Sequence, residues 1–248
     1  MCKITFLMHS CYLVELERSY LLFDYFNGML QEDYQREIVL PELKEEKWLY
    51  VFSSHFHIDH FGIEVLQWKQ KRENISYIFS KDIRLGDNFL IRHGYSPEIK
   101  EEILFVKPCK QYECRELKIH TLFSTDAGVA YVVEAEGKRI YHAGDLNWWY
   151  WDNESDQEKK NMERHYKDYL QDIAGVEIDL AFVPYDPRLQ DKAICGIEYF
   201  LQVTRTKALF PIHFWGEFDV LENIEKQLVP DTDTEIYLPA QEGDTFLL

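Results

Sequence analysis

The stretch HFHIDH, residues 55–60, places three imidazoles and one carboxylate within six consecutive positions. It follows WLYVFS, residues 48–53, an apolar run typical of a buried strand. The chain has nine histidines in 248 residues, so packing alone hardly explains three of them in so short a stretch. Neutral imidazole and carboxylate oxygen suit zinc, iron and manganese, and a loop after a strand can turn them toward one point. The stretch therefore indicates a metal site.

The rest of the chain alternates between short β-branched or aromatic runs and amphipathic segments. We expect strands at 4–8, 12–16, 20–23, 75–79, 178–184 and 208–212, a β-rich block at 117–141 with a turn at 136–138, and helices at 63–71 and 196–203. Residues 85–94 suggest a loop, and the highly charged stretch 152–172 suggests a solvated helix, a lid or an insertion. This pattern alone predicts an α/β or α+β protein. No linker rich in Gly, Pro or Ser interrupts it, so we expect one domain over residues 1–248.

Composition excludes some classes of function and location. With 27 basic and 44 acidic side chains the formal charge is −17, which disfavours a nucleic-acid partner. The N-terminal stretch has no signal-peptide pattern, and nowhere do roughly 18 apolar residues run without interruption, so we expect no membrane association. The five cysteines are scattered without a CxxC pair, which is typical of a reducing compartment. A cytoplasmic protein is the expectation.

HFHIDH matches the HxHxDH signature of the metallo-β-lactamase superfamily, and other residues fall in that family's order. They are Asp24 at the end of an early strand, the segment HAGD at 142–145, and the isolated His213 after another strand. The chain thus resembles this superfamily over nearly its full length. The resemblance implies an α/β fold: a four-layer αββα sandwich of two mixed sheets, with helices outside and metals at one edge.

The same resemblance implies the metal ligands. In the family pattern two histidines hold the first metal, an aspartate and a histidine hold the second, one aspartate bridges both, and a late histidine completes the second. These positions correspond here to His55 and His57, Asp59 and His60, Asp145, and His213. We expect one or two divalent ions, with zinc first and manganese or iron as alternatives.

One part of the family pattern is missing. The first metal usually takes a third histidine from a loop about twenty residues before the bridging aspartate, but here residues 123–128 read FSTDAG. Asp126 could replace that histidine as an oxygen ligand, His120 lies a few residues early, or the first metal could be weak or absent. An oxygen ligand hardens the site and favours manganese or iron over zinc.

Several residues around the expected metals have two interpretations. Asp24, His142 and His9 could orient metal ligands through hydrogen bonds, or the histidines could simply pack. The aromatic run at 147–151, with Trp148 as the substrate contact, could instead cover a sheet edge. Arg188 could bind an anionic group of a substrate or form a surface salt bridge, and Trp215 would make the far wall of the pocket aromatic.

The resemblance implies a hydrolase that uses a metal-bound hydroxide on a small ester, lactone or phosphodiester. Asp59 would orient the hydroxide, and water, His142 or Tyr185 would protonate the leaving group. Within the superfamily the chain looks most similar to small hydrolases related to sugar-phosphate lactonases. Two alternatives stay open: an iron-dependent oxidoreductase on the same fold, and a non-catalytic metal- or anion-binding relative. The partner expected is a small molecule, and the sequence predicts no oligomeric state.

Overall fold

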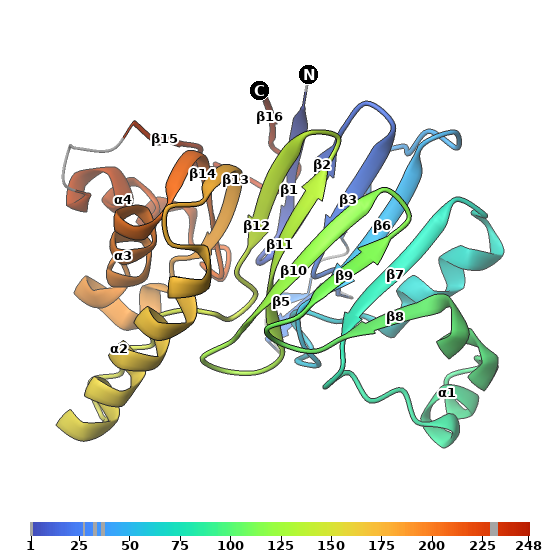
Figure 1. Cartoon of the computed structure of the whole chain (residues 1–248), viewed down its shortest axis with the longest axis horizontal. Coiled ribbons are helices and arrows are strands. Elements are labelled where there is room, and N and C mark those ends of the chain that lie inside the picture. Colours follow the sequence, from blue (N-terminus) through green and yellow to red (C-terminus); the bar gives the residue numbers. More distant parts are fainter. Residues whose placement is uncertain (1, 27, 32–33, 36–37, 229–232) are drawn as a thin grey trace.

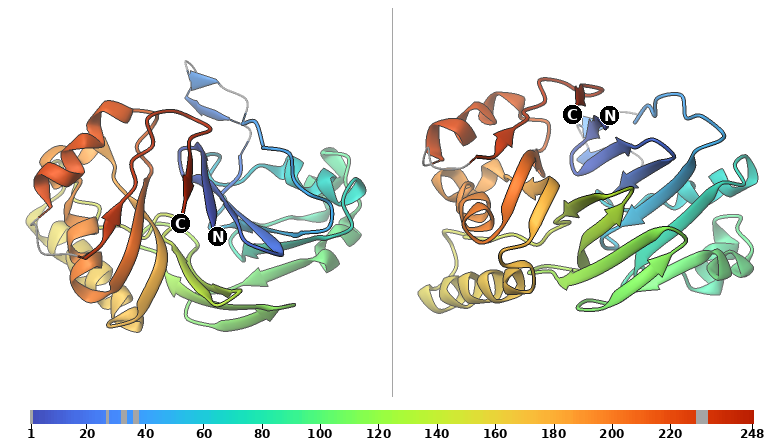
Figure 2. Two further views of the ribbon diagram at one scale, coloured as in Figure 1. Left: turned by 90° about the horizontal axis from the view of Figure 1, so that it is seen from above. Right: turned by 45° about the horizontal axis from the view of Figure 1, so that its top comes forward.

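Two mixed β-sheets of seven strands each pack face to face, with helices on their outer sides (Figures 1 and 2). The computed structural model describes residues 2–26, 28–31, 34–35, 38–228 and 233–248. The first sheet has the order β16-β1-β2-β3-β6-β7-β8, and the second has the order β15-β14-β13-β12-β11-β10-β9. The predicted αββα sandwich is confirmed.

The strands of the first sheet are β1 (Lys3–Met8), β2 (Cys11–Glu15), β3 (Ser19–Phe23), β6 (Trp48–Ser53), β7 (Ile75–Ser80), β8 (Ile103–Val106) and β16 (Thr245–Leu247). Those of the second are β9 (Gln111–Cys114), β10 (Leu117–Phe123), β11 (Val129–Ala135), β12 (Lys138–His142), β13 (Glu177–Pro184), β14 (Arg205–Ile212) and β15 (Glu235–Ile236). A small ribbon joins β4 (Met29–Gln31) to β5 (Tyr34–Gln35). Every strand expected from the sequence is present. The sequence does not predict the shortest strands, because two to four residues are too few to show an alternating pattern; these are β4, β5, β8, β9, β15 and β16.

The helices are α1 (Asp87–Arg92), α2 (Asp156–Leu170), α3 (Cys195–Val203) and α4 (Glu222–Gln227), with 3-10 segments η1 (Ile63–Gln70), η2 (Pro97–Glu102), η3 (Gln171–Ile173), η4 (Pro187–Lys192) and η5 (Phe218–Val220). The helix expected at 63–71 is a 3-10 segment, and the loop expected at 85–94 contains α1. The charged stretch 152–172 forms α2, which begins at a capping box between Ser155 and Glu158. Tyr166 and Leu170 give this largely solvated helix a buried side.

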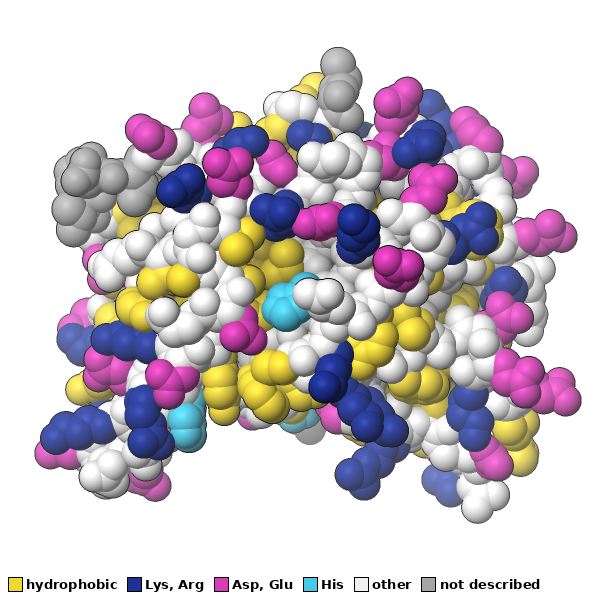
Figure 3. Space-filling view, in the orientation of Figure 1, with side chains coloured by type: hydrophobic (Ala, Val, Ile, Leu, Met, Phe, Trp, Pro, Cys, Tyr) yellow, Lys and Arg dark blue, Asp and Glu magenta, His cyan; other side chains and the backbone are white. Residues whose placement is uncertain are grey.

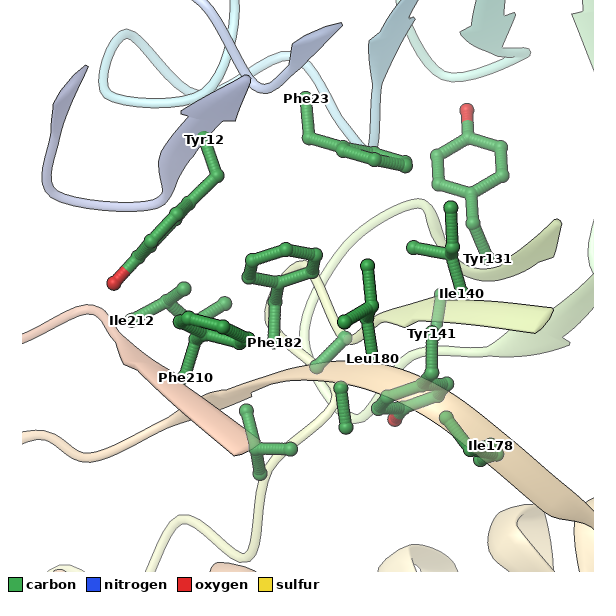
Figure 4. Close-up of a cluster of buried hydrophobic side chains, with 14 of the residues drawn as sticks. Tyr12, Phe23, Tyr131, Ile140, Tyr141, Ile178, Leu180, Phe182, Phe210 and Ile212 are labelled. Atoms are coloured by element: carbon green, nitrogen blue, oxygen red, sulfur yellow. The ribbon is translucent and has the colours of Figure 1, made fainter. Parts of the chain in front are cut away.

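Apolar side chains from both sheets fill the space between them (Figure 4). Tyr12 and Phe23 of the first sheet lie opposite Phe182 of the second, and the ring centroids of Tyr12 and Phe182 are 4.7 Å apart. Two buried hydroxyls also join the sheets: Tyr12 Oη donates to Pro211 O at 2.9 Å and Tyr131 Oη donates to Ser53 O at 2.8 Å. A second apolar cluster lies between the first sheet and the segments η1 and α1.

Both sheets place parallel strands beside one another, and this sets where the site forms. Strands β3, β6, β7 and β8 run parallel in the first sheet, and β12, β13 and β14 run parallel in the second. Their carboxyl ends meet at one edge of the sandwich, where connecting loops can carry functional side chains. The HFHIDH stretch follows β6 at this edge.

Within the described residues, no helix is long and apolar enough to cross a membrane. The face of the molecule in Figure 3 carries basic and acidic side chains interspersed, with hydrophobic side chains between them. The negative formal charge of the whole chain is therefore not concentrated on this face.

Candidate metal centre

The loop after β6 is fixed to the end of β3 by a buried carboxylate. Asp24 accepts hydrogen bonds from Ser54 N and Ser54 Oγ, both at 2.7 Å, and from His60 Nδ1 at 2.8 Å. The parallel pairing of β3 with β6 brings these residues together, since Phe23 lies opposite Phe52. Asp24 thus holds both ends of the HFHIDH stretch, which is the position expected of a residue that orients ligands.

Eight histidine and aspartate side chains form two donor groups at this edge. In each group, one ligand atom from each residue lies within 4.8 Å of the others. The first donor group is His55, His57, Asp126 and Asp145; the second donor group is His9, Asp59, His60 and His213. All seven metal ligands predicted from the sequence lie in these groups, and His9 is the addition.

Asp145 lies between the groups and faces both. Its Oδ2 is 3.3 Å from His55 Nε2 in the first donor group. Its Oδ1 is 3.2 Å from His60 Nε2 and 3.4 Å from His213 Nε2 in the second. Each oxygen of this one carboxylate can therefore bind a different cation. The position is that expected for a bridging ligand.

Hydrogen bonds at Nδ1 leave Nε2 of three histidines directed at the centre. Asp24 accepts from His60, and Asp186 Oδ2 accepts from His213 Nδ1 at 3.0 Å. Ser54 Oγ donates a hydrogen bond to Asp24, so it accepts one from His55 Nδ1 at 2.9 Å. Such partners fix the tautomer and the ring orientation of a metal ligand. Asp186 carries no signal of this role in the sequence, because a carboxylate before Pro187 is typical of a turn.

The chemistry of the two groups fits divalent cations. Four buried atoms have no hydrogen-bond partner within the described part of the chain, which is costly unless another group satisfies them: His9 Nδ1 and Nε2, His60 Nε2 and Asp145 Oδ1. Burial alone would lower the pKa of His55, yet the charges of nearby aspartates, Asp145 above all, raise it to about 9. Burial would raise the pKa of Asp145, but its histidine neighbours hold it well below the usual range. The metal-free cluster therefore holds ionised carboxylates that attract positive charge.

The loop before β11 supplies Asp126 where the family pattern has a histidine. Asp126 Oδ2 lies 3.6 Å from His57 Nδ1, and both side chains are about half exposed. The loop is tied to the Asp145 segment through Thr125 Oγ1, which donates to Asn147 O at 2.6 Å and accepts from Asn147 N at 3.0 Å. His120, the other candidate, lies on β10 and lines a separate hollow on the outside of the second sheet. The structure brings Asp126, not His120, to the first donor group.

The same loop passes very close to the HFHIDH segment. Gly128 has a φ of +69°, and a Cβ there would lie 2.0 Å from Ser54 O and 2.6 Å from His55 Cβ. Val129 N donates to Ser54 O at 3.0 Å. Only glycine allows this approach, which sets the distance between Asp126 and the histidines of the first donor group.

A cleft with aromatic walls opens beside the donor groups. It is lined by His57, Asp59, Thr125, Asp126, Asp145, Trp149, Trp151, Glu154, Met162, Arg188, His213 and Trp215. The Arg188 guanidinium lies 4.5 Å from the Trp215 ring centroid and 5.3 Å from that of Trp151. Asp186 fixes it, accepting from Arg188 Nε at 2.9 and 3.0 Å. Arg188 is therefore an oriented cation of the cleft wall, as well as the partner of an aspartate.

Two predicted site residues, Trp148 and Tyr185, lie away from the cleft. Trp148 packs on α2, with Lys167 Nζ 4.7 Å from its ring centroid, and its neighbours Trp149 and Trp151 line the cleft in its place. Tyr185 is buried in the core, and burial raises its pKa. The prediction that these two side chains face the cleft is therefore wrong. In a loop, unlike a strand, the sequence does not show which side chains point to which side.

His142 is enclosed and already fully hydrogen-bonded. Its Nδ1 accepts from Gly144 N at 3.1 Å, so its Nε2 carries the proton and donates to Ser10 O at 3.0 Å. Its ring stacks on Phe23 at 4.8 Å, and burial lowers its pKa. His142 therefore has no proton to offer a substrate in the cleft. Its position matches the alternative role, which is to support the loop that carries Asp145.

The match to a family model covers more than half of the chain. Residues 3–164 match the model described as a β-lactamase superfamily domain. The chain therefore belongs to the β-lactamase superfamily, as its motif indicated. A comparison with curated protein sequences finds no match.

Solved structures of the same fold include proteins from several organisms. Igni18, a metallo hydrolase from Ignicoccus hospitalis, is 15% identical, with coverage of 100% of this chain and 99% of that one and a TM-score of 0.58. The metallo-β-lactamase fold protein YhfI from Bacillus subtilis is 13% identical, with coverage of 99% and 98% and a TM-score of 0.58. CmlA, a diiron β-hydroxylase from Streptomyces venezuelae, is 12% identical; all of this chain covers 54% of that one, with a TM-score of 0.60. At these identities the likeness concerns the fold.

Proposed function

We propose that this protein is a metal-dependent hydrolase that acts on a small ester, lactone or phosphodiester. The observation that carries the proposal is the position of Asp145, whose two oxygens face two separate histidine and aspartate groups. The buried atoms of His9, His60 and Asp145 that have no hydrogen-bond partner among the described residues also support a cation site. His55, His57, Asp126 and Asp145 would hold one metal, and Asp59, His60, Asp145 and His213 the other.

Bound divalent metals would polarise the substrate oxygen and lower the pKa of water at the centre. Asp59 borders the cleft, and two histidine neighbours, His9 at 3.3 Å and the positive charge of His60, outweigh burial and lower the pKa of Asp59. The ionised Asp59 carboxylate would accept a hydrogen bond from the attacking water and orient it. Because His142 and Tyr185 do not reach the cleft, the leaving group would take its proton from water on the open side beside His57 and Asp126.

The charges around the cleft favour a substrate that is neutral or carries a single negative charge. Two divalent cations would exceed the charge of the carboxylates Asp59, Asp126 and Asp145 by one positive unit. Arg188 adds a positive charge that Asp186 balances, and Glu154 adds another carboxylate to the wall. An anionic group of the substrate would therefore bind by direct contact with Arg188 and the tryptophan rings, not by a broad positive field.

We propose zinc as the metal, with manganese or iron as alternatives, because four imidazoles and an open cleft suit catalytic zinc. A second candidate function, an iron-dependent oxidoreductase, is favoured by one observation: an aspartate stands in the first donor group where the family pattern has a histidine. A diiron β-hydroxylase shares the fold, which agrees with this alternative. A non-catalytic metal- or anion-binding relative is the third.

The remaining proposals concern partners and location. We propose a small-molecule substrate and no nucleic-acid partner, which the acidic composition supports. All five cysteines are free, which supports a reducing compartment such as the cytoplasm. A closer relation to sugar-phosphate lactonases and a single domain over residues 1–248 remain predictions.

Elemental analysis beside an activity panel tests the proposed function. The wild type should hold two equivalents of metal, and Asp145→Ala and Asp126→Ala should each hold less, while the exposed Asp168→Ala on α2 serves as the matched control. Protein loaded with zinc, manganese or iron is then assayed on esters, lactones and phosphodiesters, with oxygen uptake followed in parallel. Hydrolysis supports the proposal; oxygen uptake with iron and no hydrolysis supports the oxidoreductase. The absence of metal after metal-replete purification would rule out both.

A further inference from the structure

His9 lies in the turn between β1 and β2 and points into the edge where the second donor group forms. Its backbone has a φ of +53°, a left-handed conformation that histidine adopts less readily than glycine. His9 O accepts from His213 N at 3.4 Å, which joins this turn of the first sheet to the end of β14 in the second. The strained turn thus fixes His9 beside a predicted metal ligand.

The His9 ring is enclosed by the residues of the second donor group. The residue is 1% exposed. Its ring centroid lies 4.4 Å from that of His213, 5.6 Å from that of His60 and 4.7 Å from that of Trp215. Three imidazoles and the carboxylate of Asp59 therefore surround one small volume.

Among the residues that the structure describes, neither nitrogen of His9 finds a hydrogen-bond partner. Its Nε2 lies 3.3 Å from Asp59 Oδ2, at ion-pair distance but outside hydrogen-bond geometry. His55, His60 and His213 differ from it, because each has an acceptor at Nδ1. A buried imidazole without a partner is unfavourable, and an apolar ring of similar size would fill the space without that cost. This arrangement is explained if a cation binds at Nε2.

We propose that His9 Nε2 binds the same cation as Asp59, His60 and His213, and that this cation binds more tightly than the one at the first donor group. The inference rests on the proposed metal centre and adds a ligand outside the HxHxDH pattern. The second donor group then offers three imidazoles from largely buried residues. The first donor group has two imidazoles, and its His57 and Asp126 are about half exposed. The two sites should therefore fill in sequence, the second donor group first.

Titration of the chelator-treated protein with Co²⁺, followed by visible absorption against a competing chelator, tests the inference without a substrate. The wild type should bind in two steps, and His57→Ala should weaken only the looser one. His9→Ala should weaken the tighter step by about tenfold to a hundredfold and leave the looser step unchanged. Added imidazole should restore the tighter step by entering the space left by the ring.

His120→Ala is the matched control, because it removes an imidazole of β10 that lies outside both donor groups. Far-UV circular dichroism and thermal unfolding of the metal-free variants show whether they fold, and His9→Gln carries the test if the alanine variant does not. A folded His9 variant that titrates like the wild type would overturn the inference while leaving the metal centre intact. A wild type that binds no Co²⁺ would overturn the metal centre itself.

Discussion

Gly128→Ala should destabilise the protein through the backbone, before any metal is involved. The alanine Cβ would lie 2.0 Å from Ser54 O, a backbone atom that cannot turn away. A left-handed conformation costs a residue with a Cβ about 1–2 kcal/mol, and the overlap adds about 1–3 kcal/mol. The free energy of unfolding should therefore fall by about 2–5 kcal/mol. At about 2–4 °C per kcal/mol for a domain of this size, the Tm should fall by roughly 4–20 °C.

Gly137→Ala provides the control for the backbone conformation. Gly137 has a φ of +78° in the turn between β11 and β12, but no atom of the described residues lies within 4 Å of a Cβ there. This variant should lose only the conformational part, about 1–2 kcal/mol. Urea unfolding of both chelator-treated variants measures the difference. If Gly128→Ala is no less stable than Gly137→Ala, the close approach of the loop to Ser54 does not constrain the fold, and the reasoning is refuted.

Three further outcomes are expected. Asp24→Asn removes the carboxylate that orients His60, so metal affinity should fall by about tenfold to a hundredfold in chelator competition, without loss of fold by circular dichroism. Metal uptake at pH 7.5 should release protons, because the pKa of His55 is raised to about 9 in the metal-free protein. The metal affinity should therefore rise with pH until about that value. An indicator dye that detects no released proton would contradict this expectation. Tyr131→Phe removes the hydrogen bond to Ser53 O across the two sheets, and thermal unfolding should show a loss of about 1–2 kcal/mol, while no change would mean that the bond adds nothing.

The sequence predicts the centre best where its residues are neighbours along the chain. His55, His57, Asp59 and His60 follow one apolar strand, so a single local pattern places them together. Their distant partners Asp145 and His213 came from the order of the family motif and not from spacing. Asp126 could be chosen over His120 only once the turn at Gly128 was known, because that turn decides which side chain faces His57.

The residues that sequence reasoning misplaced depend on contacts between the two sheets. His9 belongs to the second donor group because the turn after β1 touches the end of β14, and no periodicity in either segment records that contact. Tyr185 and Asp186 follow β13 side by side, yet the tyrosine packs inward and the aspartate holds His213 and Arg188. Trp148 packs on α2 for a different reason: the aromatic run at 147–151 is not a strand, so no alternation predicts which of its rings face the cleft.

Each donor group draws on both sheets, with His60 following a strand of the first and His213 a strand of the second. A cation held between them would act on the chain as a cross-link, closing a loop of about 150 residues in the way that a disulfide does in a secreted domain. Such a link would restrict the unfolded chain, and it persists only while both sheets hold the cation. Metal loading would then also decide how firmly the two halves of the sandwich are joined, so that starvation for metal would expose the seam between them to proteases.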